Sequence, residues 1–197
     1  MKKKLLSSLL VLGTSVGALA PATILATDVL AEPTADITIN GSLGLDNTDP
    51  DEEIEEGDTN WVNVTLDTAT IFYNHRNTAE IASPTYNIVN NSGRPVSVSI
   101  QNFANTGGDF SEISSLTINS PEFSVSEDLI TNGELHAFPE VTNLFTLANS
   151  EGNLAANGGI TGPNAATFNY SGTVSSNTVA RANPAFTLTL QLDALKF

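Results

Sequence analysis

The chain has 197 residues and no cysteine, and 22 acidic residues against seven basic ones give it a formal net charge of −15. Disulfides, thiolate zinc sites, redox motifs and cysteine nucleophiles are therefore excluded, and the negative charge disfavours nucleic acid and anionic membranes as partners.

The N-terminus has the features of a secretory signal peptide. Three lysines at residues 2–4 precede an apolar run at 5–20, and small residues at cleavage spacing follow. The best cleavage site lies after Ala31, and the alternative lies after Ala20. Glycine and small polar residues interrupt the run, so it predicts a cleaved signal rather than a membrane anchor.

Cleavage after Ala31 leaves a mature chain of ordinary single-domain size. Residues 1–31 are interpreted as the signal peptide and residues 32–197 as one domain. The mature chain keeps four basic residues against 21 acids, a net charge of −17. We expect a secreted, extracellular protein without membrane insertion after cleavage.

Alternating apolar and polar residues recur along the mature chain, which is the pattern of strands with one buried face. No sustained period of 3.6 appears, so little helix is expected after the signal peptide. The sequence predicts an all-β fold, an antiparallel β-sandwich that is immunoglobulin-like or jelly-roll-like. The predicted strands lie at 36–43, 61–66, 70–73, 86–88, 96–100, 116–119, 122–125, 144–147, 166–174 and 185–193, with a hairpin at 129–135.

The clearest local pattern spans residues 85–103. Two alternating segments flank the turn-forming residues Asn-Asn-Ser-Gly-Arg-Pro at 90–95, which predicts a β-hairpin. The last strand, 185–193, has four apolar residues on one face and is expected at the centre of a sheet.

Residues 44–60 are acidic and contain almost nothing to bury, so they predict an exposed, mobile loop within the domain. Several of its carboxylates could in principle bind Ca²⁺. However, EF-hand spacing is absent, Pro50 interrupts the series, and runs of acids are usually solvated, so we expect no metal site. The acids concerned are Asp46, Asp49, Asp51, Glu53 and Asp58.

Catalytic residues are sparse. His75 and His136 are the two histidines, and no Gly-x-Ser-x-Gly motif accompanies them, so we expect neither an enzyme nor a bound cofactor. Trp61 is interpreted as a core or loop-anchoring residue. Lys196 is interpreted as a solvated terminal charge rather than as a partner in an isopeptide cross-link.

The layout of the chain resembles a known family. A signal peptide is followed by ADITINGSL (35–43), DNTDPDEE (46–53), IASPTYNIVNNSGRPVSVSIQNF (81–103) and FTLTLQLDAL (186–195). This order resembles the small secreted Gram-positive surface proteins that have a WxL-type domain. The Trp-x-Leu pair itself is absent, because Leu190-Gln191-Leu192 stands where the C-terminal pair would be expected.

The resemblance implies a β-rich domain that binds peptidoglycan non-covalently and joins cell-surface complexes, some of them adhesive. We therefore expect a non-enzymatic binding or structural module of the Gram-positive cell wall, with a wall polymer or other surface proteins as partners. A looser resemblance to the secreted fibre-forming matrix proteins of Bacillus supports an alternative. In that alternative the protein is the subunit of an extracellular fibre that polymerises by β-strand addition, with the strand at 36–43 as the donated strand.

Overall fold

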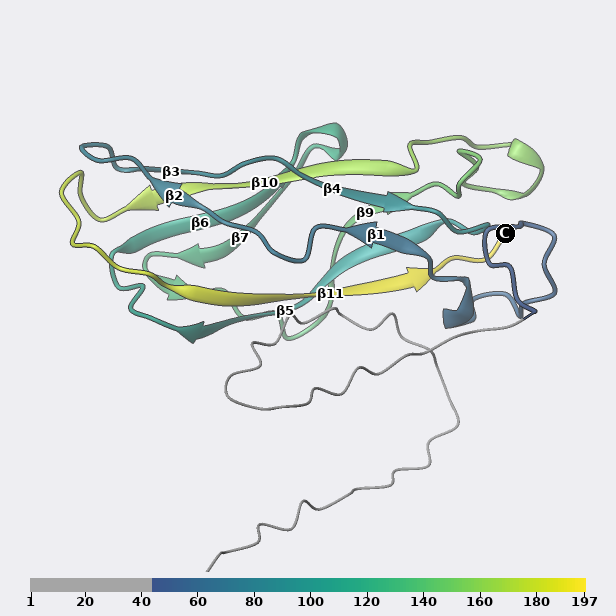
Figure 1. Ribbon diagram of the computed structural model, residues 1–197, viewed down its shortest axis with the longest axis horizontal. Coiled ribbons are helices and arrows are strands. Elements are labelled where there is room, and N and C mark those ends of the chain that lie inside the picture. The colour runs from purple at the N-terminus through teal and green to yellow at the C-terminus, as the bar shows by residue number, and fades with distance from the viewer. Residues whose placement is uncertain (1–43) are drawn as a thin grey trace, which may run out of the picture.

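The computed structural model describes residues 44–197, so the signal peptide and the strand predicted at 36–43 lie outside the described residues. Two antiparallel sheets pack against each other in a sandwich-like arrangement (Figure 1). The helical elements of this part are three-residue 3-10 turns, which confirms an antiparallel all-β fold with little helix. Within residues 44–197, no helix has the length and apolarity needed to cross a membrane.

The larger sheet has eight strands. Its main path follows the order β1 (Val64–Leu66), β4 (Tyr86–Asn90), β10 (Ala165–Val174), β6 (Ile113–Ser120), β7 (Val125–Thr131) and β8 (Glu134–Leu135). The short strands β2 (Tyr73–Asn74) and β3 (Glu80–Ala82) pair with each other, and β3 also pairs with the end of β10 beyond β4. Strands β4 and β3 therefore form successive parts of one row beside β10.

The smaller sheet has three strands, in the order β11 (Ala185–Ala194), β5 (Val96–Gly107) and β9 (Thr142–Leu147). Among the described residues β11 pairs with β5 alone, so in this part of the chain it lies at the edge of the smaller sheet and not at the expected centre. The apolar residues of β11 do pack on the core, as their alternation indicates. Alternation reports that one face is buried, but it does not report how many neighbours a strand has.

Side chains from both sheets form the core between them. Its fully buried members include Ile88, Val98, Ile100, Leu116, Leu129 and Leu147. The hairpin predicted at 129–135 is confirmed as β7 and β8, and Asn132 and Gly133 have the positive φ angles, 53° and 80°, that a type I′ turn needs. The strand predicted at 122–125 is wrong, because Pro121–Phe123 forms a 3-10 turn and β7 begins at Val125.

The segment predicted as a central hairpin is a crossing between the two sheets. Strand β4 pairs with β1 and β10 in the larger sheet, whereas β5 pairs with β11 and β9 in the smaller one. The two strands therefore do not pair with each other, and the hairpin prediction is wrong. The physical reason is that residues 92–95 between them are buried, with Gly93 packed against Asp49 and Pro50 of the acidic segment, so this turn does not project into solvent.

Side-chain hydrogen bonds replace a strand ladder at this crossing. The Asn90 Nδ2 amide donates to the carbonyl oxygens of Arg94 and Ala148, both at 2.8 Å, and its Oδ1 accepts from the Ser92 N–H. The Ser92 hydroxyl oxygen accepts from the Arg94 N–H at 3.0 Å. Asn90 is fully buried, so it satisfies backbone groups that water cannot reach.

We predict that Asn90→Ala lowers the free energy of unfolding by about 3 kcal/mol, because two buried carbonyls and one buried N–H lose their partner. Asn87→Ala, at an exposed position of the same strand, is the matched control and should change stability by less than about 0.5 kcal/mol. Chemical denaturation measures both. Equal effects of the two substitutions would contradict the role given to Asn90.

Candidate functional site

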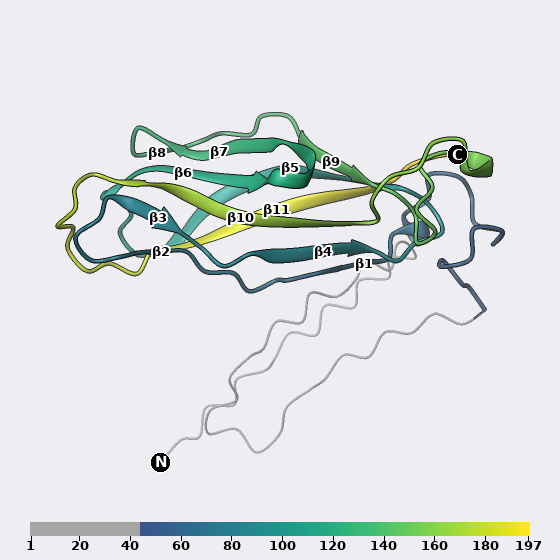
Figure 2. The same cartoon turned by 90° about the horizontal axis from the view of Figure 1, so that it is seen from above.

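The unequal sheets leave one side of the sandwich open. Three strands at about 4.8 Å spacing span roughly 14 Å, which is too narrow to cover the inner face of the eight-stranded sheet. Strand β11 forms the edge of the smaller sheet on the side where β1 and β2 form the edge of the larger one (Figure 2). The uncovered strip lies between these two edges.

An apolar groove with a cavity of about 470 Å³ occupies this strip at the end where β11 begins. One wall is the chain around β2, and the other wall is the start of β11. Its floor is formed by core residues of the larger sheet, including Ile113, Leu116 and Leu129. A volume of this size is typical of ligand sites and far exceeds the voids that a packed core tolerates.

Aromatic rings gather at the mouth of the groove around Phe186 of β11. Its ring centroid lies 5.0 Å from that of Phe103 in a stacked pair, and 5.6 Å from that of Phe110 in an edge contact. Phe72, on the opposite wall, is 6.1 Å away and is only half-buried. The rings therefore meet across the gap between the sheets without filling the space behind them.

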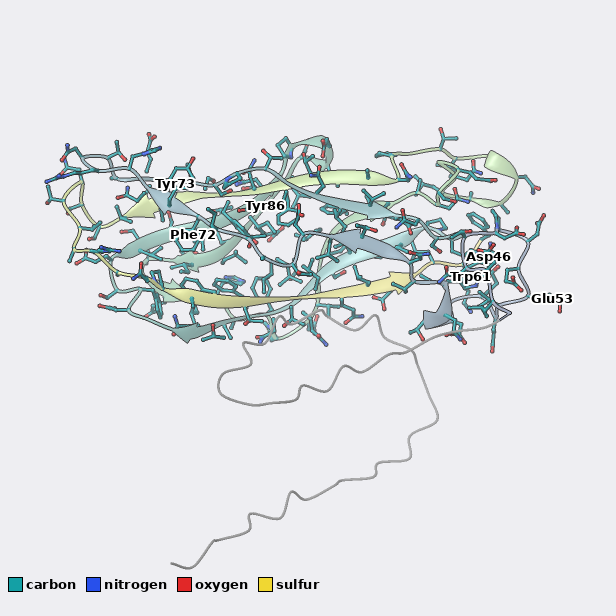
Figure 3. The ribbon with its side chains drawn as sticks, viewed as in Figure 1. Asp46, Glu53, Trp61, Phe72, Tyr73 and Tyr86 are labelled. Carbon is teal, nitrogen blue, oxygen red and sulfur yellow. The ribbon has the colours of Figure 1, made fainter. Side chains whose placement is uncertain are left out.

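Two tyrosine hydroxyls hold the wall that includes Phe72. The Tyr86 hydroxyl donates to the Ile71 carbonyl at 2.9 Å and accepts from the Ile71 N–H at 2.6 Å, and the Tyr170 hydroxyl lies 3.2 Å from Thr70 Oγ1. Burial raises the pKa of Tyr170, so its hydroxyl stays protonated at neutral pH. Figure 3 labels Phe72, Tyr73 and Tyr86 in this part of the sandwich.

The groove has few polar groups and no arrangement suited to catalysis. Asp109 and Glu112 are the acidic residues among its lining, which contains no histidine, lysine or arginine. The Asp109 carboxylate accepts hydrogen bonds from Ser111, which lowers its pKa. Within the described chain, the groove is suited to bind an apolar segment and offers no nucleophile paired with a base.

The acidic residues of the 44–60 segment do not converge on a common point. Asp46 accepts hydrogen bonds from Thr48, Asp49 from the Asp51 N–H, and Asp58 from the Asn60 N–H. These contacts are local turn and cap interactions, and those from Thr48 lower the pKa of Asp46. No group of three or more acidic or histidine side chains within residues 44–197 is placed to hold a metal ion.

The acidic segment buries more than its composition suggests. Ile54 is buried, and Glu56 pairs with Arg94, whose guanidinium also donates to the Pro50 carbonyl at 2.7 Å. Arg94 Cζ lies 4.1 Å from the ring centroid of Trp61 and 4.7 Å from that of Phe197. This group, which we call the Arg94 clamp (Glu56, Trp61, Arg94 and Phe197), ties the acidic segment to the end of the chain.

The remaining residues singled out from the sequence are scattered. Trp61 is fully buried, which confirms its interpretation as a core or anchoring residue. His75 and His136 are exposed in the segments that follow β2 and β8, respectively. Lys196 is exposed, as expected of a solvated charge. The aromatic residues of the groove were not predicted, because they come from four separate segments.

Comparison with known proteins identifies no relative of this chain. The chain matches no protein-family model. No curated protein matches it, and no solved structure matches it. The family resemblance therefore stays a prediction, and the inferences about function depend on the geometry of the groove and of the strand edge beside it.

We predict that Phe186→Ala destabilises the fold by about 2 kcal/mol, since Phe186 is half-buried and loses contacts with three rings. Thr187→Ala, at the exposed neighbouring position, is the control and should be nearly neutral. The free energy of unfolding from urea titration distinguishes them. A neutral Phe186→Ala would show that the aromatic cluster contributes no packing energy.

We also predict that the Arg94 clamp weakens in acid. The hydrogen bond from Arg94 lowers the pKa of Glu56 below its usual value of 4.5, so Glu56 stabilises the fold above that value. This contribution is lost as the pH falls from about 4.5 through the lower pKa of the folded state. Glu56→Gln should reduce the dependence of Tm on pH in this window, and Glu53→Gln, at an exposed position, should leave it unchanged.

Proposed function

We propose that this protein is an extracellular, non-enzymatic structural subunit that assembles by accepting an added β-strand along the free edge of β11. The observation that supports this most directly is the apolar groove beside that edge. An added strand would form hydrogen bonds with β11 through its backbone and would place alternate side chains in the groove. The smaller sheet would then gain a fourth strand.

The chemistry of β11 supports its use as an acceptor edge. Natural edge strands are usually protected by lysine, proline or a bulge that discourages pairing. Residues 185–194 contain neither lysine nor proline, and Asp193 is their single charged residue. The ladder with β5 has two register shifts, but the extra residue lies in β5 at both of them. Leu188, Leu190 and Leu192 pack on the core but stay half-buried, so apolar surface continues along the strand beyond the cavity.

The donor that best fits the groove is segment 36–43 of another copy. Its sequence alternates Ile37, Ile39 and Leu43 with polar residues, so one face suits the groove and the other suits water. With the expected cleavage after Ala31, residues 32–35 would precede this segment, and the donor would lie near the start of the mature chain. A free strand at one end and an acceptor edge elsewhere form a heterologous contact, which generates rings or open filaments.

Two further expectations from the sequence concern direct wall binding and the type of β-sandwich. Direct wall binding through Leu190-Gln191-Leu192 is disfavoured because Leu190 and Leu192 pack on the core, which leaves only Gln191 on the outer face. A jelly-roll-like rather than immunoglobulin-like arrangement is favoured because the chain changes sheet at five of its connections, β4–β5, β5–β6, β8–β9, β9–β10 and β10–β11.

The experiment is assembly of the chain that begins at Glu32, followed by light scattering and electron microscopy. We expect polymers from the unmodified chain and monomers after Ile39→Asp or deletion of residues 32–43, because the groove would lose its apolar occupant. Asn40→Asp, on the polar face of the same segment, is the charge-matched control and should still polymerise. Circular dichroism checks that each variant is folded.

The result that would contradict the proposal is unchanged polymer formation by the folded Ile39→Asp and deletion variants. Sedimentation with purified Gram-positive walls tests the other expectation. Salt-resistant binding by the monomeric Ile39→Asp variant would favour a wall-binding module that does not depend on strand addition.

A further inference from the structure

The described chain enters the fold at one end of β11. The Asn47 carbonyl accepts from the Gly93 N–H at 2.7 Å, and its side chain bonds to Asn60 and Asn63. Gly57, in the same segment, lies against the side chain of Lys196, which follows β11. Figure 1 shows the acidic segment at the end of the sandwich where the β11 arrow ends.

The chain that precedes Asn47 can therefore reach the groove of its own molecule. Only residues 44–46 separate segment 36–43 from this anchored position. Eight extended residues span about 26 Å, and the ten residues of β11 span about 33 Å. The segment is thus long enough to lie along most of β11 and to bring its first residues near the cavity.

The direction of such a strand follows from the path of the chain. In such a strand residue 43 would be placed near Ala194 and residue 36 towards Ala185, because the described chain enters from the Ala194 end. β11 itself runs from Ala185 to Ala194. A segment placed in its own groove is therefore parallel to β11.

We propose that, in an isolated copy, segment 36–43 occupies the molecule's own groove as a strand parallel to β11, and that assembly exchanges this strand between copies. The inference rests on the proposed function and adds its regulation: the donor of each copy also blocks that copy's acceptor. Exchange preserves the contacts and the polarity of the closed form, as in domain swapping. The polymer therefore uses parallel pairing as well.

The short connection makes the closed form strongly favoured at low concentration. A tethered segment on a short flexible linker has an effective concentration on the order of millimolar. At about 1 µM protein, the concentration of segments from other copies is roughly a thousandfold lower than the effective concentration of the molecule's own segment. Assembly consequently needs high local concentration or an event that releases the segment.

The test uses engineered disulfides in the chain that begins at Glu32, which has no cysteine of its own to interfere. One cysteine replaces a polar-face residue of the segment, Thr38, Asn40 or Ser42, and the other replaces an outer-face residue of β11, Thr187, Thr189 or Gln191. Apolar packing in the groove is left untouched. Asn40→Cys combined with Ser126→Cys, on exposed β7 of the other sheet, is the control.

Mild oxidation at about 1 µM should give intramolecular disulfides that exceed intermolecular ones by a hundredfold or more, read by mass and by mobility on non-reducing gels. The preferred β11 position should move from Thr187 towards Gln191 as the segment position moves from Thr38 towards Ser42. The control pair should not close. The reverse order would show antiparallel pairing and overturn the inference.

Two other outcomes would also contradict the inference of a self-occupied groove, and they differ in what they imply for the proposed strand addition. Disulfides that form only between copies would show an open groove in the monomer but would leave strand addition intact. No disulfide to β11 at any position, in folded chains that still polymerise, would exclude this segment from the groove altogether and so remove the proposed donor as well.

A measurement without cysteines gives an independent answer. In the monomer, Ile39→Asp should speed hydrogen exchange of the β11 amides that face away from β5 at least tenfold relative to Asn40→Asp, because the parallel strand that protects them is released. Equal exchange rates in the two variants would contradict the inference that the segment occupies its own groove in the monomer. Polymer formation at high concentration would still test strand addition separately.

Discussion

The fold depends on how the chain crosses between its two sheets at residues 90–95. A buried crossing must satisfy backbone groups that have no ladder partner and no water. The buried amide of Asn90 does this for the Arg94 carbonyl within the crossing and for the Ala148 carbonyl that follows β9, and Ser92 adds a further bond. The crossing thereby places β4 in the larger sheet and β5 in the smaller one.

Two features at opposite ends of the molecule bear on the proposed strand exchange. At one end, Arg94 at the crossing anchors the acidic segment through Glu56 and Trp61, which fixes where the N-terminal chain enters. At the other end, the narrow second sheet leaves the groove beside β11 open. The entry point and the open edge together make strand exchange geometrically accessible, whereas no described cluster of polar side chains suggests a reaction.

Local patterns predicted local structure well and predicted pairing poorly. The alternation at 166–174 and the Asn132-Gly133 turn specify strands and a hairpin through contacts that are close in sequence, and both are present. The turn-forming residues at 90–95 gave the wrong pairing, because a tight turn and a crossing between sheets use the same residue types. The groove was not predicted, since Phe72, Phe103, Phe110 and Phe186 meet only after distant segments pack together.

The long pairing of β11 with β5 also has a mechanical meaning. The two strands match over ten residue pairs, which makes theirs the most extended ladder described in the molecule. In a filament built by strand exchange, tension would enter each subunit along the strand beside β11 and leave through the anchored acidic segment. The backbone bonds of that part of the sheet would then be loaded in shear, many at once, rather than peeled apart singly. A thin three-stranded sheet could in this way serve as the tensile element of an extracellular fibre.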